Sequence, residues 1–576
     1  MPYDYIGLFA EDAERASVLD ELIRLGMRPR GQVGRVTLFA PDATPVASLP
    51  GGGLCVGKLY DNHGREADLT SAFARQAEKA TMFRQLLERF WGQYVVLLPA
   101  DDSSGAVSVL RDPSGAVGCA FQPRAPCCFL TSSVGIAAGV GLYRSVIDWT
   151  FIQHCVAYPH LKLERTGLAG LQELLPGSAV TLTARSHADS QAMWTPWQFL
   201  GGAQHRRDPA TAAGSIREAV TKVVDTLASE DGSLLLELSG GLDSSIVGAC
   251  LARTAARVSC CTAVTPLRGA DERRYAALIA ELLDVELRAC TLDFDDARID
   301  FPVPASSLRP AVWALSRSVG RIMDEAAEHA KVSALFSGGG GDTVFAYLTT
   351  ASPAADAFRA GGLAEGCKAV ANLSRLHGCT VAKAAWLTLR KLYRRPHDPP
   401  APDTRFLSAN WRLPSLTPHP WFSAPRSALV GDRERVLGLI GTQLFGDATP
   451  RGGGRRVRMP LLAQPVVEAC LRVPSWMWID GGRNRAIARD AFSEALPETI
   501  LNRRSKGTFM NYTASVYRRS RQTIASFLLD GSLQAQGLLD RAALERYLAQ
   551  PPVARDDTFM RLFDLCMIEN WVRHHR

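Results

Sequence analysis

The first part of the chain consists of short apolar runs separated by turn residues. Four of these runs, at residues 36–39, 94–98, 107–110 and 178–182, have the β-branched and aromatic character of strands. This part of the chain is therefore predicted to be rich in β-sheet.

The pattern of apolar positions changes near residue 200. Around residues 198–212 periodicity is lost, and glycine, proline and charged residues gather as they do in linkers. We therefore predict two units, residues 1–200 and residues 208–576.

In the second unit, helical and strand patterns alternate. Helical periodicity covers residues 213–229, 244–256 and 271–283, whereas residues 234–238 and 258–265 are apolar runs of strand length. Such alternation predicts an α/β fold with a buried parallel sheet.

The composition is that of a globular protein. Of its 576 residues, 47% are hydrophobic and 21% charged, and the net charge of +7 is mild for this length. The 13 cysteines show no C-x-x-C spacing, and no apolar run reaches the roughly 18 residues of a membrane span. The start of the chain has no signal-peptide pattern either. We expect a cytoplasmic protein with no nucleic-acid or membrane partner.

The loop Ser239–Ser245 is the most informative segment. It reads Ser-Gly-Gly-Leu-Asp-Ser-Ser and joins an apolar strand to a helix. Glycines let the backbone approach a polyanion, while serine hydroxyls and helix N–H groups donate to its oxygens. Because a carboxylate beside phosphate needs a cation between them, Asp243 is predicted to bind magnesium. A serine-capped turn is the alternative, but the seven-residue pattern favours phosphate binding.

A second glycine loop, Ser337–Asp342, also follows a short apolar strand. Loops that follow parallel strands emerge at the same edge of a sheet, so we expect Asp243 and Asp342 to share one Mg²⁺ ion. A turn whose aspartate caps the next helix is the alternative.

The third segment, Asn502–Gly507, is basic. Its Lys506 is a candidate to neutralise charge on pyrophosphate or on an acyl-adenylate, although such residues also form solvated surface patches. A further basic segment, Arg451–Arg458, combines glycines with arginines and is expected to be a loop.

In order and spacing, these three segments resemble the synthetase domain of the asparagine synthetase family, which adenylates a carboxylate with ATP and joins it to an amine. The resemblance implies a doubly wound ATP-pyrophosphatase domain with added helices, the cofactors ATP and Mg²⁺, and catalytic roles for Asp243, Asp342 and Lys506. The ATP and pyrophosphate ligands that it implies are Leu238, Ser239, Gly240, Gly241, Leu242, Asp243, Ser244, Ser245, Thr262, Val264, Ser337, Gly338, Gly339, Gly340 and Lys506.

The first unit resembles the family's N-terminal glutaminase domain through residues 110–115 and 170–177. Glutamine-using members carry a cysteine nucleophile directly after the initiator methionine, where this chain has Pro2, and the nearest cysteine is Cys55. We expect a glutaminase-like (Ntn-type) sandwich that lacks its nucleophile and does not release ammonia.

The second loop departs from asparagine synthetases, because Gly339 and Thr343 replace two glutamates. Residues 460–468, with the second loop and the Lys506 segment, look most like the lasso-peptide macrolactam synthetases. These enzymes adenylate an Asp or Glu side chain of a precursor core peptide, which the peptide's N-terminal amine then attacks. The partners implied are that peptide, a leader-peptide protease and a leader-recognition protein.

Other functions remain open. They are a small-molecule cyclase like the β-lactam synthetases, a non-catalytic ATP- or peptide-binding module, and a glutamine-hydrolysing asparagine synthetase, which Pro2 disfavours. The substrate candidates are Arg458, within a family segment, and Tyr347. The β-lactam synthetases use a Tyr–Glu pair as base, for which Tyr347 and Glu325 are candidates by residue type alone, and the base stays unassigned.

Overall fold

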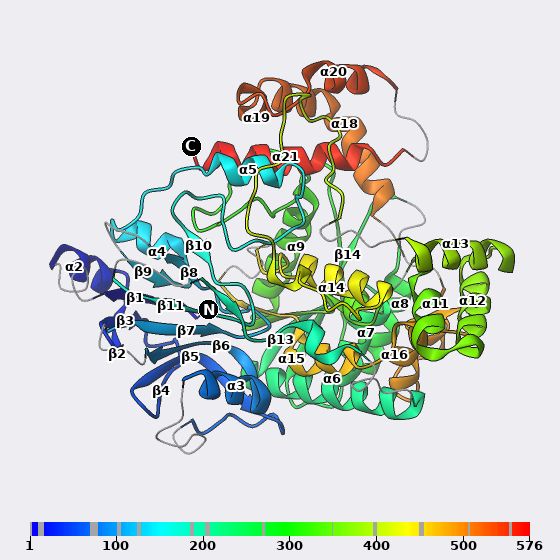
Figure 1. The fold of residues 1–576 in the computed structure, drawn as a ribbon, viewed down its shortest axis with the longest axis horizontal. Helices are drawn as coiled ribbons and strands as arrows, with labels where there is room; N and C mark the ends of the chain where they lie inside the picture. Colours follow the sequence, from blue (N-terminus) through cyan, green and yellow to red (C-terminus); the bar gives the residue numbers. More distant parts are fainter. Residues whose placement is uncertain are drawn as a thin grey trace.

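The N-terminal unit contains two six-stranded antiparallel sheets (Figure 1). The computed structural model describes residues 3–9, 16–69, 79–100, 105–123, 128–184, 189–201, 208–267, 271–347, 349–394, 400–447, 454–504, 507, 509–551 and 556–576. The first sheet has the order β10 (Gln172–Glu173), β8 (Ala120–Gln122), β9 (Phe129–Thr131), β1 (Ile6–Phe9), β3 (Val36–Ala40) and β2 (Arg28–Val33). The second has the order β12 (Gln191–Ala192), β11 (Ser178–Leu182), β7 (Val107–Arg111), β6 (Phe90–Pro99), β5 (Gly53–Asp61) and β4 (Val46–Leu49). All four predicted strands are confirmed.

Alternate residues of β6 face two different cores. Val95 and Leu97 pack between the two sheets, whereas Tyr94 and Val96 pack in a core that includes the C-terminal unit. The helices of this unit are α2 (Ala16–Arg24), α3 (Lys79–Arg89), α4 (Val134–Gly139), α5 (Trp149–Cys155) and the 3-10 turn η1 (Pro196–Phe199). The second sheet is thus covered on both faces, which explains its nearly continuous apolar sequence.

The C-terminal unit is built on a five-stranded parallel sheet. Its order is β15 (Leu287–Thr291), β14 (Arg257–Val264), β13 (Ser233–Glu237), β16 (Ala334–Ser337) and β17 (Arg456–Arg458). From β13 the chain progresses outward through β14 to β15, then returns to the other side of β13 for β16 and β17. A switch point of this kind creates a crevice at the carboxyl ends of β13 and β16. The expectation of a loop at Arg451–Arg458 is wrong for Arg456–Arg458, which form the edge strand β17.

Helices cover both faces of the parallel sheet. Leu234 and Leu236 of β13 join the core that contains α6 (Pro209–Asp231), α7 (Leu242–Leu251) and α8 (Arg273–Leu282). Leu235 joins the opposite core with α9 (Ala314–Ala330). The predicted parallel α/β arrangement is confirmed.

The remaining elements surround this layered centre, and α18–α21 lie at the top of Figure 1. They are α10 (Gly341–Val344), α11 (Ser352–Asp356), the π-helical turn η2 (Ala357–Gly361), α12 (Leu363–His377), α13 (Val381–Tyr393), η3 (Pro420–Phe422), α14 (Val430–Thr442), η4 (Pro460–Leu462), α15 (Gln464–Leu471), η5 (Ser475–Trp478), β18 (Ile479–Asp480), β19 (Arg483–Asn484), α16 (Ala486–Ala491), α17 (Glu498–Leu501), α18 (Met510–Leu529), α19 (Ser532–Ala535), α20 (Arg541–Ala549) and α21 (Phe559–His574). Within the described ranges, no helix combines the length and apolar character required to cross a bilayer.

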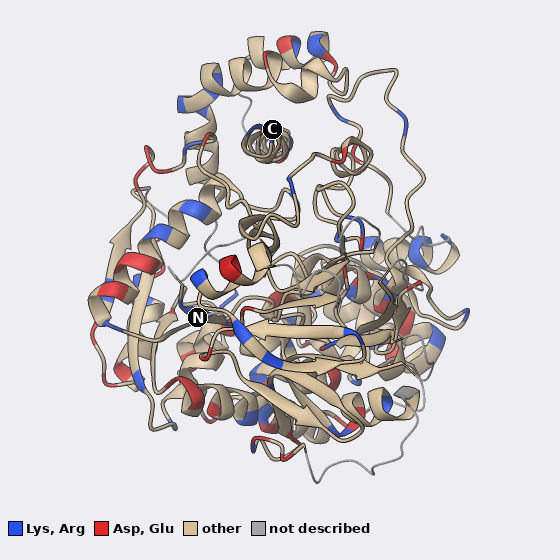
Figure 2. Cartoon of the chain, turned by 90° about the vertical axis from the view of Figure 1, so that its left-hand side faces the viewer, with Lys and Arg blue, Asp and Glu red and all other residues tan. Residues whose placement is uncertain are grey.

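The positions of basic and acidic residues are interspersed along the backbone drawn in Figure 2. A network of charges, most of them buried, joins the two units. Glu173 accepts from Arg111 at 2.7 Å, lies 2.9 Å from the Lys162 ammonium and pairs with Arg309, while Asp447 lies 2.9 Å from Lys162 and 2.8 Å from Arg309. Burial alone would raise the pKa of Glu173, but the three cations hold this pKa well below its usual value. We call these five residues the Glu173 network.

Candidate functional site

The two glycine loops lie side by side at the carboxyl edge of the parallel sheet. Ser239–Ser245 follows β13 and Ser337–Asp342 begins at the end of β16, and Glu237 pairs with Ser337 in the register of these neighbouring strands. Both loops therefore open into the crevice at the switch point, as the sequence predicted.

The first loop is held in shape by its own hydroxyl groups. The Ser239 hydroxyl accepts from the Gly241 N–H at 3.3 Å and lies 3.1 Å from the Ser244 hydroxyl, which accepts from the Ser239 N–H at 3.2 Å. Gly241 directly precedes α7, so the positive end of the helix dipole lies beside the loop. Leu238 and Leu242 lie in the core, so only their main-chain groups are available to a ligand. The Ser245 side chain is buried as well.

Close approach of the two loops requires glycine in the second one. A Cβ atom at Gly338 would lie 2.5 Å from the Ser244 nitrogen, and one at Gly341 would lie 2.5 Å from the Asp243 carboxyl carbon. Any larger residue would push the loops apart. The glycines thus bring Asp243 and Asp342 together.

A single arginine joins these two aspartates. The Arg485 Nη1 atom lies 2.9 and 3.1 Å from the carboxylate oxygens of Asp243 and 2.8 Å from Asp342 Oδ1. Its guanidinium also lies over the ring of Tyr347, 5.2 Å from the ring centroid. Two carboxylates from different loops therefore converge on one positive charge.

Arg485 has the left-handed backbone conformation, with φ of 53°, directly before α16. A non-glycine residue in this region carries strain that surrounding contacts must offset. Arg489, on the same short helix, donates to the carbonyl of Asn484 at 2.9 Å and to that of Arg503 at 3.2 Å. Burial and the neighbouring Arg485 and Arg483 lower the pKa of Arg489 to about 10.

The aspartate pair fits the magnesium ion predicted from the sequence. Mg²⁺ is usually held by one or two carboxylates together with phosphate oxygens and water, and the acidic oxygens here already converge on one cationic nitrogen. Among the described residues, no cluster of three or more His, Cys, Asp or Glu side chains forms a complete metal cage. Asp243 and Asp342 would therefore need ligands from the nucleotide itself.

A second ion pair ties the C-terminal basic segment to the first loop. Arg503 donates to the Gly240 carbonyl at 2.9 Å, pairs with Glu272 and stacks on Tyr275 at 3.9 Å from the ring centroid. Glu272 also accepts from the Gly507 N–H at 2.7 Å. The chain on both sides of residue 506 is thus anchored beside Ser239–Ser245, although Lys506 itself lies outside the described residues.

The other predicted ligands lie on the neighbouring strand. Thr262 and Val264 are at the end of β14, next to β13, and both are buried. The Val264 carbonyl accepts from the Leu292 N–H at 2.7 Å. The structure places them beside the first loop, and their contact with adenine stays a prediction.

Arg458 is not available to a substrate, and this corrects the expectation for it. Its side chain is 1% exposed, and its guanidinium lies 2.9 Å from Asp231 and 2.8 Å from Glu230 and donates to Gln93 of β6. Arg458 therefore links β17 to the N-terminal unit. The other tentative residue, Tyr347, is 40% exposed beside Arg485, whereas Glu325 is on α9 and pairs with Arg321.

The cysteines described in the N-terminal unit are all buried: Cys55, Cys119, Cys128 and Cys155. Burial raises the pKa of Cys119 to about 11 and that of Cys155 to about 12, and it raises the pKa of Cys55 further. Because the thiolate is the nucleophilic form, none of these three has the electrostatic environment of a catalytic cysteine.

The sequence predicted no site role for Arg485, Glu272 or Tyr275. Arg485 meets Asp342 across 143 residues of sequence, and its local pattern is that of any helix start. For Glu272 and Tyr275, the signal was their occurrence just before and within a helix that packs on the first loop.

Comparison with known proteins gave one family. The family model described as Asn_synthase, asparagine synthase, matches residues 215–573. A solved structure described as the allosteric regulatory enzyme of purine biosynthesis matches at 11% identity over 58% of this chain and 84% of its own. A glutamine phosphoribosylpyrophosphate (PRPP) amidotransferase from B. subtilis, complexed with ADP and GMP, matches at 10% identity over 58% of this chain and 80% of its own. Both TM-scores are 0.21, too low to support an argument. No curated protein sequence matches the chain.

Proposed function

Because the chain belongs to the asparagine synthase family, whose model covers residues 215–573, we propose that it is an ATP-dependent lasso-peptide macrolactam synthetase. Family membership implies ATP-dependent ligase chemistry, and the peptide substrate and ring closure are our proposal. An Asp or Glu side-chain carboxylate of a core peptide attacks the α-phosphorus of ATP and pyrophosphate leaves. The peptide's N-terminal amine then attacks the acyl-adenylate, loses a proton and releases AMP, which leaves an isopeptide bond.

The observation that carries this proposal is the pair of glycine loops whose aspartates meet at the switch point. The exposed Ser239 hydroxyl and the N–H groups at the start of α7 provide donors for a departing pyrophosphate. Asp243 and Asp342 would hold Mg²⁺, which when bound neutralises phosphate charge. We propose that Lys506, adjacent to the anchored Gly507, adds positive charge for the pyrophosphate and the acyl-adenylate.

The remaining work of the protein is positional. A pre-folded peptide turns attack by its own amine into a unimolecular step, and a closed site keeps water from the acyl-adenylate. The Glu272–Arg503 pair contributes by holding the basic segment beside the first loop. A leader-peptide protease and a leader-recognition protein would supply the trimmed peptide.

Two observations favour a peptide over aspartate and ammonia. The second loop has Gly339 and Thr343 where asparagine synthetases have glutamates, so it lacks two acidic groups of their site. In addition, the cysteines described in the N-terminal unit are buried, which does not suit ammonia release from glutamine.

The test is turnover of ATP to AMP and pyrophosphate, followed with mass spectrometry of the peptide. The assay uses purified protein, magnesium and candidate core peptides with a free N-terminus and an internal Asp or Glu. We expect AMP with loss of one water from the peptide, abolished by Asp243→Ala and retained by Asp225→Ala, which changes an exposed aspartate of α6. AMP formation only with a small β-amino acid would indicate a β-lactam synthetase-like enzyme, and ATP binding without AMP for any substrate would indicate a binding module.

A further inference from the structure

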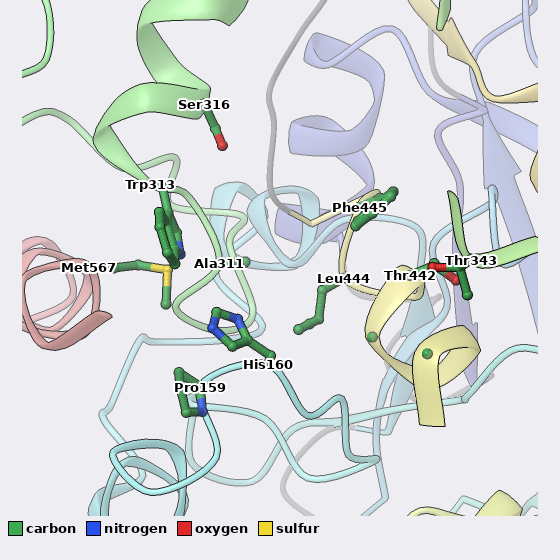
Figure 3. Close-up of a pocket in the computed structure, with 12 residues that line it drawn as sticks. Pro159, His160, Ala311, Trp313, Ser316, Thr343, Thr442, Leu444, Phe445 and Met567 are labelled. Atoms are coloured by element: carbon green, nitrogen blue, oxygen red, sulfur yellow. The ribbon is translucent and has the colours of Figure 1, made fainter. Parts of the chain in front are cut away.

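A cavity of about 390 Å³ borders the second glycine loop (Figure 3). Thr343, the residue after Asp342, forms part of its wall. Figure 3 shows Thr343 and Thr442 at one end of the cavity and Trp313, Met567 and Pro159 at the other. The cavity therefore extends from Thr343, which directly follows the second glycine loop, toward α9 and the C-terminal helix α21.

The lining of this cavity is mainly apolar. Its large side chains are Trp313, Leu444, Phe445 and Met567, and no Asp, Glu, Lys or Arg is among the described residues that line it. Its one titratable side chain, His160, is directed to Asp564, with Nε2 3.3 Å from the carboxylate. A charged substrate group placed here would lose its hydration without gaining a counter-ion in the wall.

The cavity walls are held by buried polar contacts. Asp447, just beyond Phe445, is fixed by Lys162 and Arg309 of the Glu173 network. Gln443 directly follows α14, and its side-chain oxygen lies 3.0 Å from His419 Nε2. These contacts keep the segment that contains Leu444 and Phe445 in place without a ligand, as in ligand sites that are largely pre-formed.

Missing side chains on α14 create the space. Gly438 and Gly441 lie on this helix and line the cavity. A Cβ atom at Gly438 would lie 2.9 Å from the Thr343 methyl carbon, whereas one at Gly441 would meet no atom within 4 Å. Glycine within a helix costs about 1 kcal/mol relative to alanine, so the open volume at Gly441 is retained at some expense of stability.

We propose that this cavity binds a large apolar side chain, aromatic or long aliphatic, of the peptide whose carboxylate is activated at the adjoining loops. The identification of the ligand as a peptide rests on the proposed function. The cavity volume lies within the range of roughly 300–1,000 Å³ typical of ligand sites. The cavity thus sets the substrate class: a peptide with a bulky apolar residue near its activated Asp or Glu, and not a small charged amino acid.

The first experiment measures binding without turnover. N-acetyl-phenylalaninamide, which is neutral, is titrated into the full-length protein and followed by ligand-observed NMR. Gly441→Leu fills the cavity and should weaken binding by about tenfold or more. Gly214→Leu is the matched control, because Gly214 is also a helical glycine whose Cβ would meet no atom within 4 Å, but it lies on α6. The control should bind as the wild type does.

A second variant fills the cavity from the opposite wall. Ser316→Leu on α9 should weaken binding as Gly441→Leu does, so the test does not depend on one variant folding correctly. Thermal unfolding and ATP binding verify that each variant is intact. Equal affinity of the wild type and both filled variants, or no saturable binding by the wild type, would overturn the proposal.

A measurement of AMP formation tests the apolar site separately from the proposed function. Paired peptides differ only in a Phe or a Ser beside the Asp or Glu, and AMP formation is compared. We expect Gly441→Leu to lower kcat/KM for the Phe peptide toward that of the Ser peptide. If wild-type protein forms no AMP with any peptide but binds the amide probe at this cavity, the proposed function fails and the apolar site stands. Equal kcat/KM for both peptides would overturn the proposed specificity.

Discussion

Asp243 and Asp342 lie at a partly open sheet edge and share one arginine, whereas Glu173 is buried and surrounded by three cations. The Asp342 side chain is 42% exposed and that of Glu173 is 3% exposed. An accessible carboxylate can exchange its partner for a metal or a ligand, but a carboxylate surrounded by buried cations cannot be released without a large cost. The aspartate pair thus suits chemistry, and the Glu173 network suits assembly of the two units.

The largest difference between an effect on activity and an effect on stability is expected from Asp342→Asn. Removing one of the two carboxylates should lower kcat/KM for AMP formation at least about a thousandfold, or about 4 kcal/mol. The stability to urea should change little because the side chain is half exposed. Asp480→Asn, at an exposed ion pair with Lys368, is the control for both measurements. Full activity of Asp342→Asn would show that Asp342 has a structural role only.

The reverse outcome is expected for Glu173→Gln. Loss of its charge leaves Arg111, Lys162 and Arg309 with too few counter-ions, and we expect a loss of about 3 kcal/mol or more in the free energy of unfolding. Urea denaturation measures it. Glu66→Gln, which breaks an exposed pair with Lys58, should cost under about 1 kcal/mol. Equal effects of the two variants would contradict the contrast drawn above.

The buried side chain of His419 makes the stability of the protein depend on pH. Burial lowers the pKa of His419 to about 4 from 6.5. Below pH 6.5 the imidazole of His419 takes up a proton in the unfolded chain but not in the folded protein, so its contribution to stability should fall by about 1.4 kcal/mol per pH unit down to about pH 4. Urea midpoints from pH 4 to 8 measure this slope.

The control for this slope is a pair of variants. His419→Gln should reduce the slope by about 1.4 kcal/mol per pH unit and leave the part that comes from His154, whose pKa burial also lowers to about 4. His63→Gln, at an exposed position, should leave the slope unchanged. Parallel slopes for the wild type and His419→Gln would show that other groups control acid stability.

Arg485 does not fit the distinction between an exchangeable aspartate pair and a fixed, buried network, because it is buried yet contacts both aspartates. If it serves as their exchangeable counter-ion, Arg485→Met should raise the affinity for Mn²⁺, measured by electron paramagnetic resonance without nucleotide, by about tenfold. Arg483→Met, which removes an exposed neighbouring pair, is the control. Unchanged Mn²⁺ affinity together with a large loss of stability would make Arg485 purely structural.

The smallest effect is expected at Cys55. It is buried on β5 with a raised pKa, so Cys55→Ser should leave AMP formation unchanged and cost about 1–2 kcal/mol of stability for a buried hydroxyl. Glutamine hydrolysis is measured in the same preparation. Glutaminase activity that disappears in Cys55→Ser would show that the N-terminal unit has retained chemistry.

Local patterns account for most of what could be predicted from the sequence. The strand β13, the loop Ser239–Ser245 and the helix α7 follow from periodicity and turn chemistry over about twenty residues, although α7 begins two residues before the predicted start. The meeting of Asp243 with Asp342 was also predictable, because parallel strands end at a common edge.

Contacts that depend on distant and irregular segments were not predictable. Arg458 binds Asp231 across 227 residues, so a short basic segment that resembles a loop becomes a buried edge strand. Arg485 reaches the aspartates from the position just before a helix of six residues whose sequence has no distinguishing feature. In both cases a partner of opposite charge that is distant in sequence decides the position, and local propensity carries no information about that partner.

The core that Tyr94 and Val96 share with α6 and α7 also bears on how such a protein can change during evolution. A catalytic residue at the surface of a domain can be lost by one substitution with little effect on folding. Deleting the N-terminal unit would instead expose one side of that core and leave Arg309, Asp447 and Arg458 without the partners that the unit provides. The N-terminal unit therefore contributes to the packing and charge balance of its neighbour, whether or not it carries out a reaction of its own.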